Sequence, residues 1–136
     1  MHNRGLIQDY AKRAEIRLKA IATLYAEESW ADVVRESQEA VELALKALLR
    51  AAGIEVPRIH DVSGILLKER DLLPQSLHKD IEQFAAISKN LCRDRELAYG
   101  SEDLTPSEFY NKRDADQAFK DAKFTVMAVK GALPRE

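Results

Sequence analysis

Apolar residues recur every three or four positions along almost the whole chain, and this spacing constrains the fold more than any other feature. A period of this kind places apolar side chains on one face of an α-helix. In residues 6–27 the stripe consists of Tyr10, Ala14, Leu18, Ile21 and Tyr25. Alternating apolar and polar runs, which are typical of strands, do not occur in the sequence. The sequence therefore predicts an all-α protein.

Glycine and proline divide this helical pattern into segments. They gather at positions 53–57, 73–74 and 100–106, where chain reversals are expected. Long helices are predicted over residues 6–27, over residues 29–52, from Pro74 to about Tyr99, and from Thr105 onward, with a shorter helix over residues 60–72. Four long helices and one short helix joined by short loops favour an antiparallel up-and-down four-helix bundle. Residues 1–136 are expected to form a single domain of this kind.

Several predicted helix ends have recognisable signals. Ser29 is favoured over Ala31–Asp32 as the N-cap of the second helix, and Gly53 stands where a residue with positive φ ends a helix. Asp61 or Ser63 is expected to cap the short helix. The clearest start is Thr105-Pro106-Ser107-Glu108, which matches the capping-box pattern.

The charge and the cysteine content exclude several kinds of protein. With 21 basic and 23 acidic residues the net charge is −2, so RNA could bind only at a local basic patch. The single cysteine, Cys92, excludes an internal disulfide and a cysteine-based zinc site, and it fits a reducing compartment. The sequence shows no signal peptide and no apolar run of membrane length, which predicts a cytoplasmic protein without a membrane partner.

No motif for a cofactor or a metal is found in the sequence. P-loop, dinucleotide, zinc and nucleophile-elbow patterns are missing, and no cofactor is expected. Glu39 and Glu42 stand one helical turn apart, but a carboxylate metal site in a helical bundle needs a Glu-x-x-His motif, which the chain lacks. Lys46 follows Glu42 by four residues, a favourable ion-pair spacing on a helix. The sequence therefore predicts no metal site.

Three segments, taken together and in this order, resemble the HEPN family, named for nucleotide-binding proteins of higher eukaryotes and prokaryotes. Residues 29–49 resemble the family's second helix, in which a segment of small residues and Gln precedes an Ala-x-Glu-x-x-x-Lys-Ala run. Gly53 and then His60-Asp61 resemble its loop and third-helix start, and residues 93–100 stand where the family carries its signature. The resemblance covers nearly the whole chain and implies a helical bundle.

The resemblance also implies a site and partners. Arg93 and Asp94 match the first two positions of the signature found in ribonuclease members, but Tyr99 stands where a His is expected. Arg93, Asp94 and Tyr99 are therefore the candidate catalytic residues, and Arg93 and Arg95 the candidate phosphate-binding residues. Family members are typically homodimers that work with a small nucleotidyltransferase as a toxin–antitoxin pair or act as ribonucleases in defence. In a homodimer the two Arg93 residues should approach each other across a two-fold axis.

The missing His leaves the activity open. Metal-independent RNA cleavage needs a base that takes the proton of the 2′-OH and a cation that stabilises the charge on the phosphate. An arginine supplies the cation, whereas a tyrosine with a pKa of about 10 is a poor base. One hypothesis is a homodimer that binds nucleotide or RNA phosphate and partners a nucleotidyltransferase. The alternatives are an endoribonuclease that uses Arg93 with Tyr99 in place of His, and a structural adaptor without a ligand.

Simpler interpretations of the same residues remain open. Residues 93–96 also fit a solvated helix end, and Tyr99 fits a packing residue. His60-Asp61 resembles a His–carboxylate pair, although a cap with His60 packed at the loop explains it as well; His60 is retained as an alternative base. Near the proposed site the predicted fourth helix carries more apolar surface than one bundle face requires, which predicts a dimer contact. Its residues are Phe84, Ile87, Ser88 and Leu91.

Overall fold

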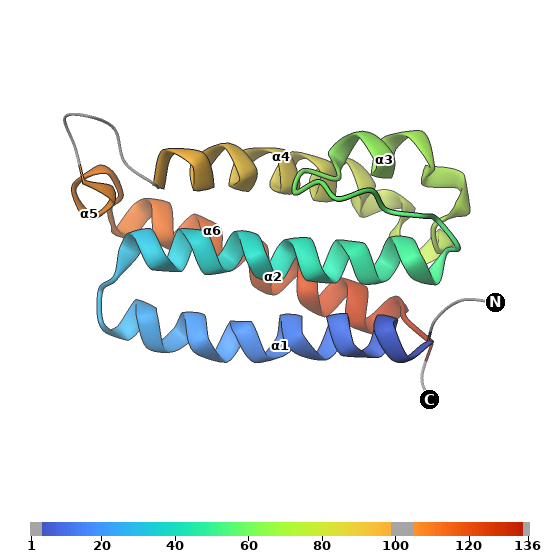
Figure 1. The fold of residues 1–136 in the computed structure, drawn as a ribbon, viewed down its shortest axis with the longest axis horizontal. Helices are drawn as coiled ribbons and strands as arrows, with labels where there is room; N and C mark the ends of the chain where they lie inside the picture. Colours follow the sequence, from blue (N-terminus) through green and yellow to red (C-terminus); the bar gives the residue numbers. More distant parts are fainter. Residues whose placement is uncertain (1–3, 99–104, 135–136) are drawn as a thin grey trace.

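Four long helices form an antiparallel bundle in the computed structural model, which describes residues 4–98 and 105–134. They are α1 (Arg4–Ala26), α2 (Trp30–Ala51), α4 (Ile81–Ala98) and α6 (Lys112–Ala132). The chain runs up and down through them in sequence order, as Figure 1 shows. No strand occurs among the described residues. The predicted all-α four-helix bundle is confirmed, although it carries more than one short additional helix.

The second helix, α2, forms the centre of the bundle. It packs against α1, α6 and α4, and its buried residues cover a wide arc of the helix opposite a stripe of charged residues that includes Arg35, Glu39 and Lys46. Such a wide apolar arc is stable only when several neighbours cover it. Its fully enclosed side chains include Val33, Val34, Leu45, Leu48 and Leu49. The core of the molecule therefore lies along α2.

The end of α2 follows the prediction made from Gly53. This residue has a φ of 79°, the left-handed conformation that glycine adopts at little cost. The N–H of Gly53 donates to the carbonyl of Arg50, and the N–H of Ile54 donates to the carbonyl of Leu49. These two bonds form a Schellman motif, which satisfies carbonyls at the helix end.

The predicted N-cap role of Ser29 is only half right. Ser29 does occupy the position before α2, but its side chain accepts no backbone hydrogen bond. Instead its Oγ donates to the Asp32 carboxylate at 2.6 Å. The carboxylate is the stronger acceptor for this hydroxyl, and so the serine side chain turns toward it.

Short helical turns connect α2 to α4. They are α3 (Ser63–Lys68) and two 3₁₀ turns, Arg70–Leu72 and Gln75–Asp80. The prediction that one long helix begins at Pro74 was wrong, because α4 begins at Ile81. The N–H of Leu77 donates to the Pro74 carbonyl in a three-residue step, which tightens this turn and buries Leu77. Leu73 is extended, with φ −83° and ψ 156°, as expected before a proline.

The prediction that the last helix begins at Thr105 was also wrong. Thr105 accepts the N–H of Glu108 but caps only the four-residue helix α5 (Pro106–Phe109). A new capping box then starts α6, in which Asn111 and Asp114 exchange side-chain and backbone hydrogen bonds at 3.0 Å. The break lies at Tyr110, which is buried. The chain turns there so that this ring reaches the interior before α6 begins.

Candidate functional site

The predicted site residues lie at the last turns of α4. Arg93 and Asp94 follow the buried Leu91, and the side chain of Arg93 is 69% exposed. Tyr99 lies outside the described residues, and of Arg95 only the backbone within α4 is described. Of the predicted site, the structure therefore describes the side chains of Arg93 and Asp94, which are neighbours in the sequence and form an ion pair. The predictions for Tyr99 and Arg95 stay predictions.

The ion pair between Arg93 and Asp94 is loose. The Arg93 Nε lies 3.6 Å from the Asp94 Oδ1, and the Asp94 side chain is 35% exposed. Burial raises the pKa of Asp94 above its ordinary value, against the opposing effect of the Arg93 charge and hydrogen bond. One charged partner thus stabilises the carboxylate less than burial destabilises it. The Arg93 guanidinium keeps most of its donors directed to solvent.

Tyr110, which the sequence interpretation did not identify, supports this end of α4. Its hydroxyl donates to the backbone carbonyl of Asp94. Burial, followed by the negative charges of Asp94 and Asp114, raises the pKa of Tyr110 well above its ordinary value. The ring therefore stays neutral and keeps its proton for this hydrogen bond. It links the start of α6 to the last turns of α4.

The residues expected to form a dimer contact are buried within a single chain. Phe84, Ile87, Ser88 and Leu91 all belong to the interior, and the Phe84 ring packs 5.5 Å from that of Phe124. The sequence argument for a dimer from these residues was therefore wrong, because α4 turns this face toward the other helices. Dimerisation itself stays a prediction.

A network of polar side chains crosses the seam between α2 and α4. At its centre, the Glu42 carboxylate accepts a hydrogen bond from Gln38 at 2.7 Å and one from Lys46 at 2.8 Å. The Nδ1 of His60 lies 2.9 Å from the same carboxylate. The predicted Glu42–Lys46 pair is confirmed. The His60 contact joins it to the loop that follows α2.

Burial and hydrogen bonding oppose each other at Glu42. Its side chain is only 12% exposed, and burial alone would raise its pKa. Hydrogen bonds from Lys46, His60 and Gln38, with the Lys46 charge, together hold the pKa of Glu42 below its ordinary value. The carboxylate is therefore ionised at neutral pH. It presents a fixed negative charge to the His60 imidazole, whose side chain remains 67% exposed.

The loop that carries His60 is fastened to α4. The N–H of Val62 donates to the Ser88 Oγ at 3.1 Å, and this hydroxyl donates to the Asp61 Oδ1 at 3.2 Å. Asp61 also accepts the N–H of Ser63 at 2.9 Å. The prediction that Asp61 or Ser63 is the N-cap was wrong, because Val62 occupies that position and no side chain caps the helix. These bonds hold the residues directly after His60 against α4.

Gln38 connects the network to the predicted site. It is buried, and its Nε2 lies 3.8 Å from the Sγ of Cys92, the neighbour of Arg93. The sequence interpretation did not assign Gln38 a role. A signal was present, because Gln38 is a polar residue among Val34, Val41 and Leu45 on the apolar face of the helix. A buried amide usually has hydrogen-bond partners, and these partners were the missing information.

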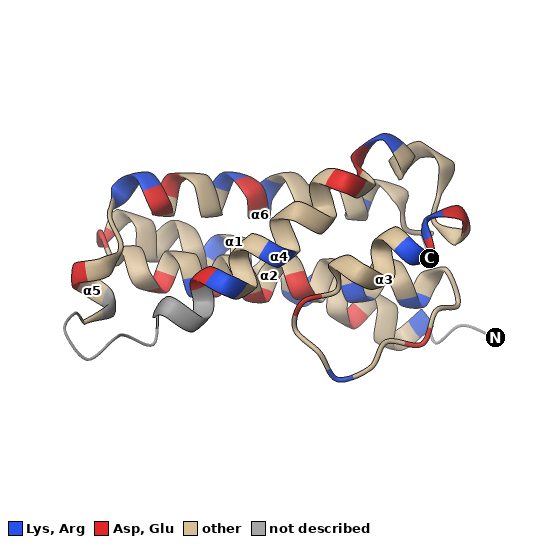
Figure 2. Ribbon diagram, turned by 90° about the horizontal axis from the view of Figure 1, so that it is seen from above, with Lys and Arg blue, Asp and Glu red and all other residues tan. Residues whose placement is uncertain are grey.

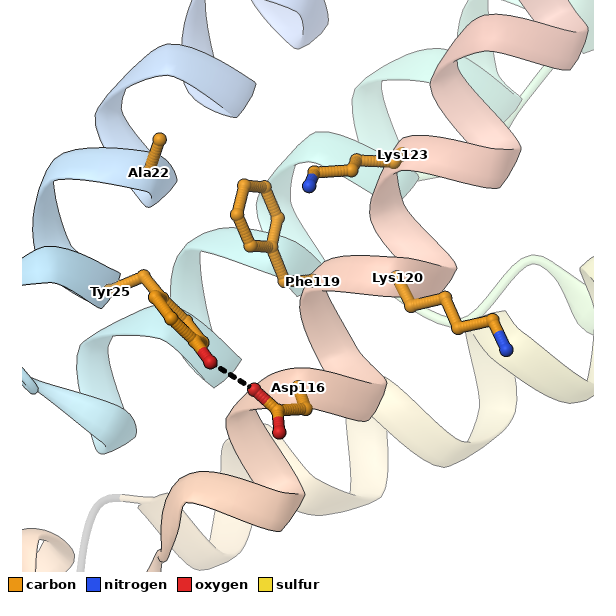
Figure 3. Close-up of a pocket in the computed structure, with 6 residues that line it drawn as sticks. All are labelled: Ala22, Tyr25, Asp116, Phe119, Lys120 and Lys123. Atoms are coloured by element: carbon orange, nitrogen blue, oxygen red, sulfur yellow. Dashed lines mark hydrogen bonds between the residues drawn. The ribbon is translucent and has the colours of Figure 1, made fainter.

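A shallow hollow between α1 and α6 offers a second group of polar and aromatic residues (Figure 3). The Tyr25 hydroxyl donates to Asp116 at 2.5 Å, and the Lys123 ammonium lies 3.8 Å from the centre of the Phe119 ring. The charged groups here are paired with a neighbour or directed to water. Basic and acidic residues are interspersed along α6 (Figure 2), and Asp116 offsets part of the positive charge of Lys120 and Lys123 in the hollow. Its geometry supports a phosphate site less well than the end of α4.

Metal binding and membrane insertion each need a recognisable structural feature. Among the described residues no group of three or more His, Cys, Asp or Glu side chains could hold a metal ion. Within the same part of the chain, none of the helices combines the length and the apolar character that crossing a membrane requires.

Comparison with known proteins identifies the family. A sequence model of the HEPN domain matches residues 7–132. The "Putative toxin MJ1304" of Methanocaldococcus jannaschii is 31% identical over 131 residues, which cover 91% of this chain and 86% of that protein. The crystal structure of ST0689, an archaeal HEPN homologue, superposes with a TM-score of 0.67 and 26% identity over 92% of this chain and 95% of that one. Because the domain match extends over nearly every residue of the bundle, the chain belongs to the HEPN family.

Proposed function

We propose that this HEPN protein binds a phosphate group of a nucleotide or of RNA through Arg93. The observation that carries the proposal is the exposure of the Arg93 side chain, which is 69% accessible two residues after the buried Leu91. A planar guanidinium can donate two hydrogen bonds to one phosphate. Its ion pair with Asp94 is loose, with the Arg93 Nε 3.6 Å from the Asp94 Oδ1. A phosphate can therefore compete for it.

Dimerisation would strengthen this site. The C-terminal end of a helix disfavours an anion because of its partial negative charge, so a single Arg93 gives weak binding. A homodimer with a two-fold axis near α4 would add a second Arg93, and Arg95 would add further positive charge. The net charge of −2 makes such local concentration necessary. Light scattering at micromolar concentration tests this step, and a monomer would contradict it.

The relative supports a proposal for the biological setting. The name of the archaeal relative describes a toxin, which supports a role for this chain in a toxin–antitoxin or defence system. The partner that we propose is a small nucleotidyltransferase. Co-purification of the chain with such a protein encoded beside it would test the partnership. A chain that purifies alone when both are produced together would contradict it.

Fluorescence anisotropy with a labelled single-stranded RNA oligonucleotide tests the Arg93 site. Arg93→Ala should weaken binding by about tenfold to a hundredfold, because each hydrogen bond to a charged group contributes about 1.5–3 kcal/mol. Arg13→Ala is the matched control, since Arg13 also lies on an exposed helix face and pairs with an aspartate, Asp9, at 3.8 Å. Equal affinities for both variants and the unaltered protein would contradict the proposal and favour a structural adaptor.

A further inference from the structure

The seam between α1 and α6 is open on its solvent side. Both helices pack closely on α2 but meet each other only lightly. Polar contacts join them, from Lys130 to Glu15 at 2.9 Å and from Tyr25 to Asp116 at 2.5 Å. We call the α1–α6 face the side chains that share a helix face with Glu15 on α1 and with Asp116 and Lys130 on α6. Two helices on a common third helix leave a furrow in which a further helix can lie.

Aromatic rings form the floor of this face at the hollow shown in Figure 3. The centroid of the Tyr25 ring lies 6.1 Å from that of Phe119 and 5.1 Å from that of Trp30. Phe119 is only partly buried, and the small side chain of Ala22 faces it from α1. The Lys123 ammonium lies 3.8 Å from the centre of the Phe119 ring. A flexible charged side chain therefore covers this ring.

Two more apolar side chains are exposed on the same face. Ile16 of α1 is 51% exposed and Met127 of α6 is 54% exposed. Among the described side chains of the four long helices, these two are the only large apolar residues exposed to this degree. Each lies within one helical turn of the pair between Glu15 and Lys130, about two turns from the hollow. Apolar surface thus recurs along the seam.

The same face concentrates positive charge. Only two carboxylates, Glu15 and Asp116, lie on it, since Asp114 and Asp121 stand two positions from members of the α6 stripe and face another side of that helix. Two of its lysines are paired with these carboxylates, at 2.9 and 3.3 Å, and the other four form no ion pair with residues that the structure describes. Six lysines against two carboxylates leave a surplus of four positive charges, on a chain with a net charge of −2. The lysines are Lys12, Lys19, Lys112, Lys120, Lys123 and Lys130.

We propose that the α1–α6 face binds an acidic amphipathic helix of a partner protein. Apolar residues of that helix pack on Ile16, Met127 and the Phe119 ring, from which Lys123 can move aside. Its carboxylates pair with the lysines on both sides of the seam. An amphipathic helix buries its apolar stripe in such a furrow, while complementary charge sets its orientation and speeds association.

Other anionic partners fit this face less well. The Glu15 and Asp116 carboxylates interrupt the rows of lysines that the phosphates of an RNA strand would follow. A membrane surface needs a continuous apolar face, whereas the exposed apolar side chains here lie apart on two helices. The face is also separate from Arg93, because α1 and α4 lie on opposite sides of α2 (Figure 1). The proposal therefore does not depend on the phosphate site.

Fluorescence anisotropy with a labelled helical peptide of Leu, Ala and Glu, with the Leu residues along one stripe, tests this proposal. The peptide should bind, and Lys120→Glu/Lys123→Glu should weaken binding about tenfold, because each change replaces an attraction by a repulsion. Lys68→Glu/Lys79→Glu is the matched control. Both of its lysines are exposed on the connection between α2 and α4, and the net charge changes equally. The control should bind the peptide as the unaltered protein does.

Met127→Ala separates apolar packing from charge. Loss of the side chain should weaken peptide binding about threefold and leave the urea midpoint unchanged, because the residue is exposed. A peptide of the same composition with the Leu residues scrambled should bind about tenfold more weakly, since it presents no apolar stripe. Absence of binding, equal binding of the two peptides, or equal losses in the two charge-reversed variants would overturn the proposal.

Two other occupants of the face are distinguished by the same variants. Single-stranded RNA that displaces the peptide and is lost in Lys120→Glu/Lys123→Glu would identify a nucleic-acid surface instead. A dimer in light scattering that dissociates in this variant would identify a second copy of the chain. Either result overturns the proposal. Arg93→Ala should leave the peptide affinity unchanged, so failure of the phosphate site and failure of this face are seen separately.

Discussion

Two carboxylates, Glu42 in the middle of α2 and Asp94 near the end of α4, have opposite pKa shifts. Burial has the largest single effect on both carboxylates, and it raises the pKa of each. Glu42 has three hydrogen-bonding partners, and its pKa is lowered. Asp94 has one loose cationic partner at 3.6 Å, and its pKa is raised. The number and quality of the partners decide the sign, because they must outweigh the cost of removing the charge from water.

The comparison separates charged groups that hold the structure together from a charged group that can bind a ligand. The charges around Glu42 are engaged with one another, so the middle of the seam is rigid and can position His60. The charges at the end of α4 are poorly matched, which leaves Arg93 able to exchange Asp94 for a phosphate. Five variants and conditions can break or sharpen this contrast.

Glu42→Gln should have the largest effect on stability. The substitution removes the negative charge and leaves Lys46, whose side chain is 17% exposed, without its ion pair. We expect the free energy of unfolding to fall by about 2 kcal/mol, measured by urea denaturation. A loss no larger than that of Asp94→Asn would show that the two carboxylates do not differ as described.

The stability difference between the unaltered protein and Glu42→Gln should depend on pH. The unfolded chain protonates Glu42 near the ordinary pKa of 4.5, and the folded chain does so at lower pH. Below pH 4.5 the unfolded chain binds more protons, so the stability that Glu42 contributes declines as the pH falls. The difference in the free energy of unfolding should have its full value above pH 4.5. It should shrink toward zero as the pH falls through the pKa of Glu42 in the folded chain. Urea titrations across this range measure it, and a constant difference would contradict the assignment.

Tyr110→Phe should have the next largest effect. The change removes the hydroxyl that donates to the Asp94 carbonyl but keeps the buried ring. We expect a loss of about 1 kcal/mol in the free energy of unfolding, with faster amide exchange in the last turns of α4. If exchange there is unchanged while global stability falls, the hydrogen bond does not hold this end of the helix.

Asp94→Asn should change stability little and RNA affinity more. Its pKa is raised by burial, so the ionised form is penalised at neutral pH and removing the charge should leave stability within about 0.5 kcal/mol. Any gain in stability over the unaltered protein should shrink as the pH falls, because Asp94 of the unaltered protein is then protonated and no longer charged. Arg93 loses its competitor, so RNA affinity in the anisotropy assay should increase. A weaker complex would indicate that Asp94 positions Arg93 rather than competing for it.

Tyr25→Phe should have the smallest effect. The hydroxyl contacts Asp116 on the face between α1 and α6 (Figure 3), where water can replace the lost hydrogen bond. We expect the urea midpoint and the RNA affinity to match those of the unaltered protein. A loss of RNA binding would move the candidate site from the end of α4 to this hollow.

Much of the fold was predictable because helix formation depends on neighbouring residues. Gly53 ended α2 as expected from its sequence position, and Leu73 was extended because it precedes Pro74. The errors arose where a distant contact chose between two local signals. Thr105 and Asn111 both offer a cap, and the burial of Tyr110 against α4 favoured the second for the long helix.

The candidate site was only partly predictable. Arg93 and Asp94 followed from the resemblance, and the Glu42–Lys46 pair followed from its four-residue spacing. The contact of Gln38 with Cys92 and the contact between His60 and Glu42 did not follow, because they join segments that are apart in the sequence. The apolar surface assigned to a dimer was misplaced for the same reason, since α4 buries Phe84 against Phe124.

The sequence by itself determined that the chain is helical and roughly where its helices lie. These properties depend on a period of 3.6 residues and on caps, which act within a turn or two. Only the tertiary structure decided that an imidazole from the loop after α2 meets an enclosed carboxylate of α2. The reason is physical: the contact of Gln38 with Cys92 and the hydrogen bond from Val62 to Ser88 require α2 and the loop after it to pack on α4, which no local pattern specifies.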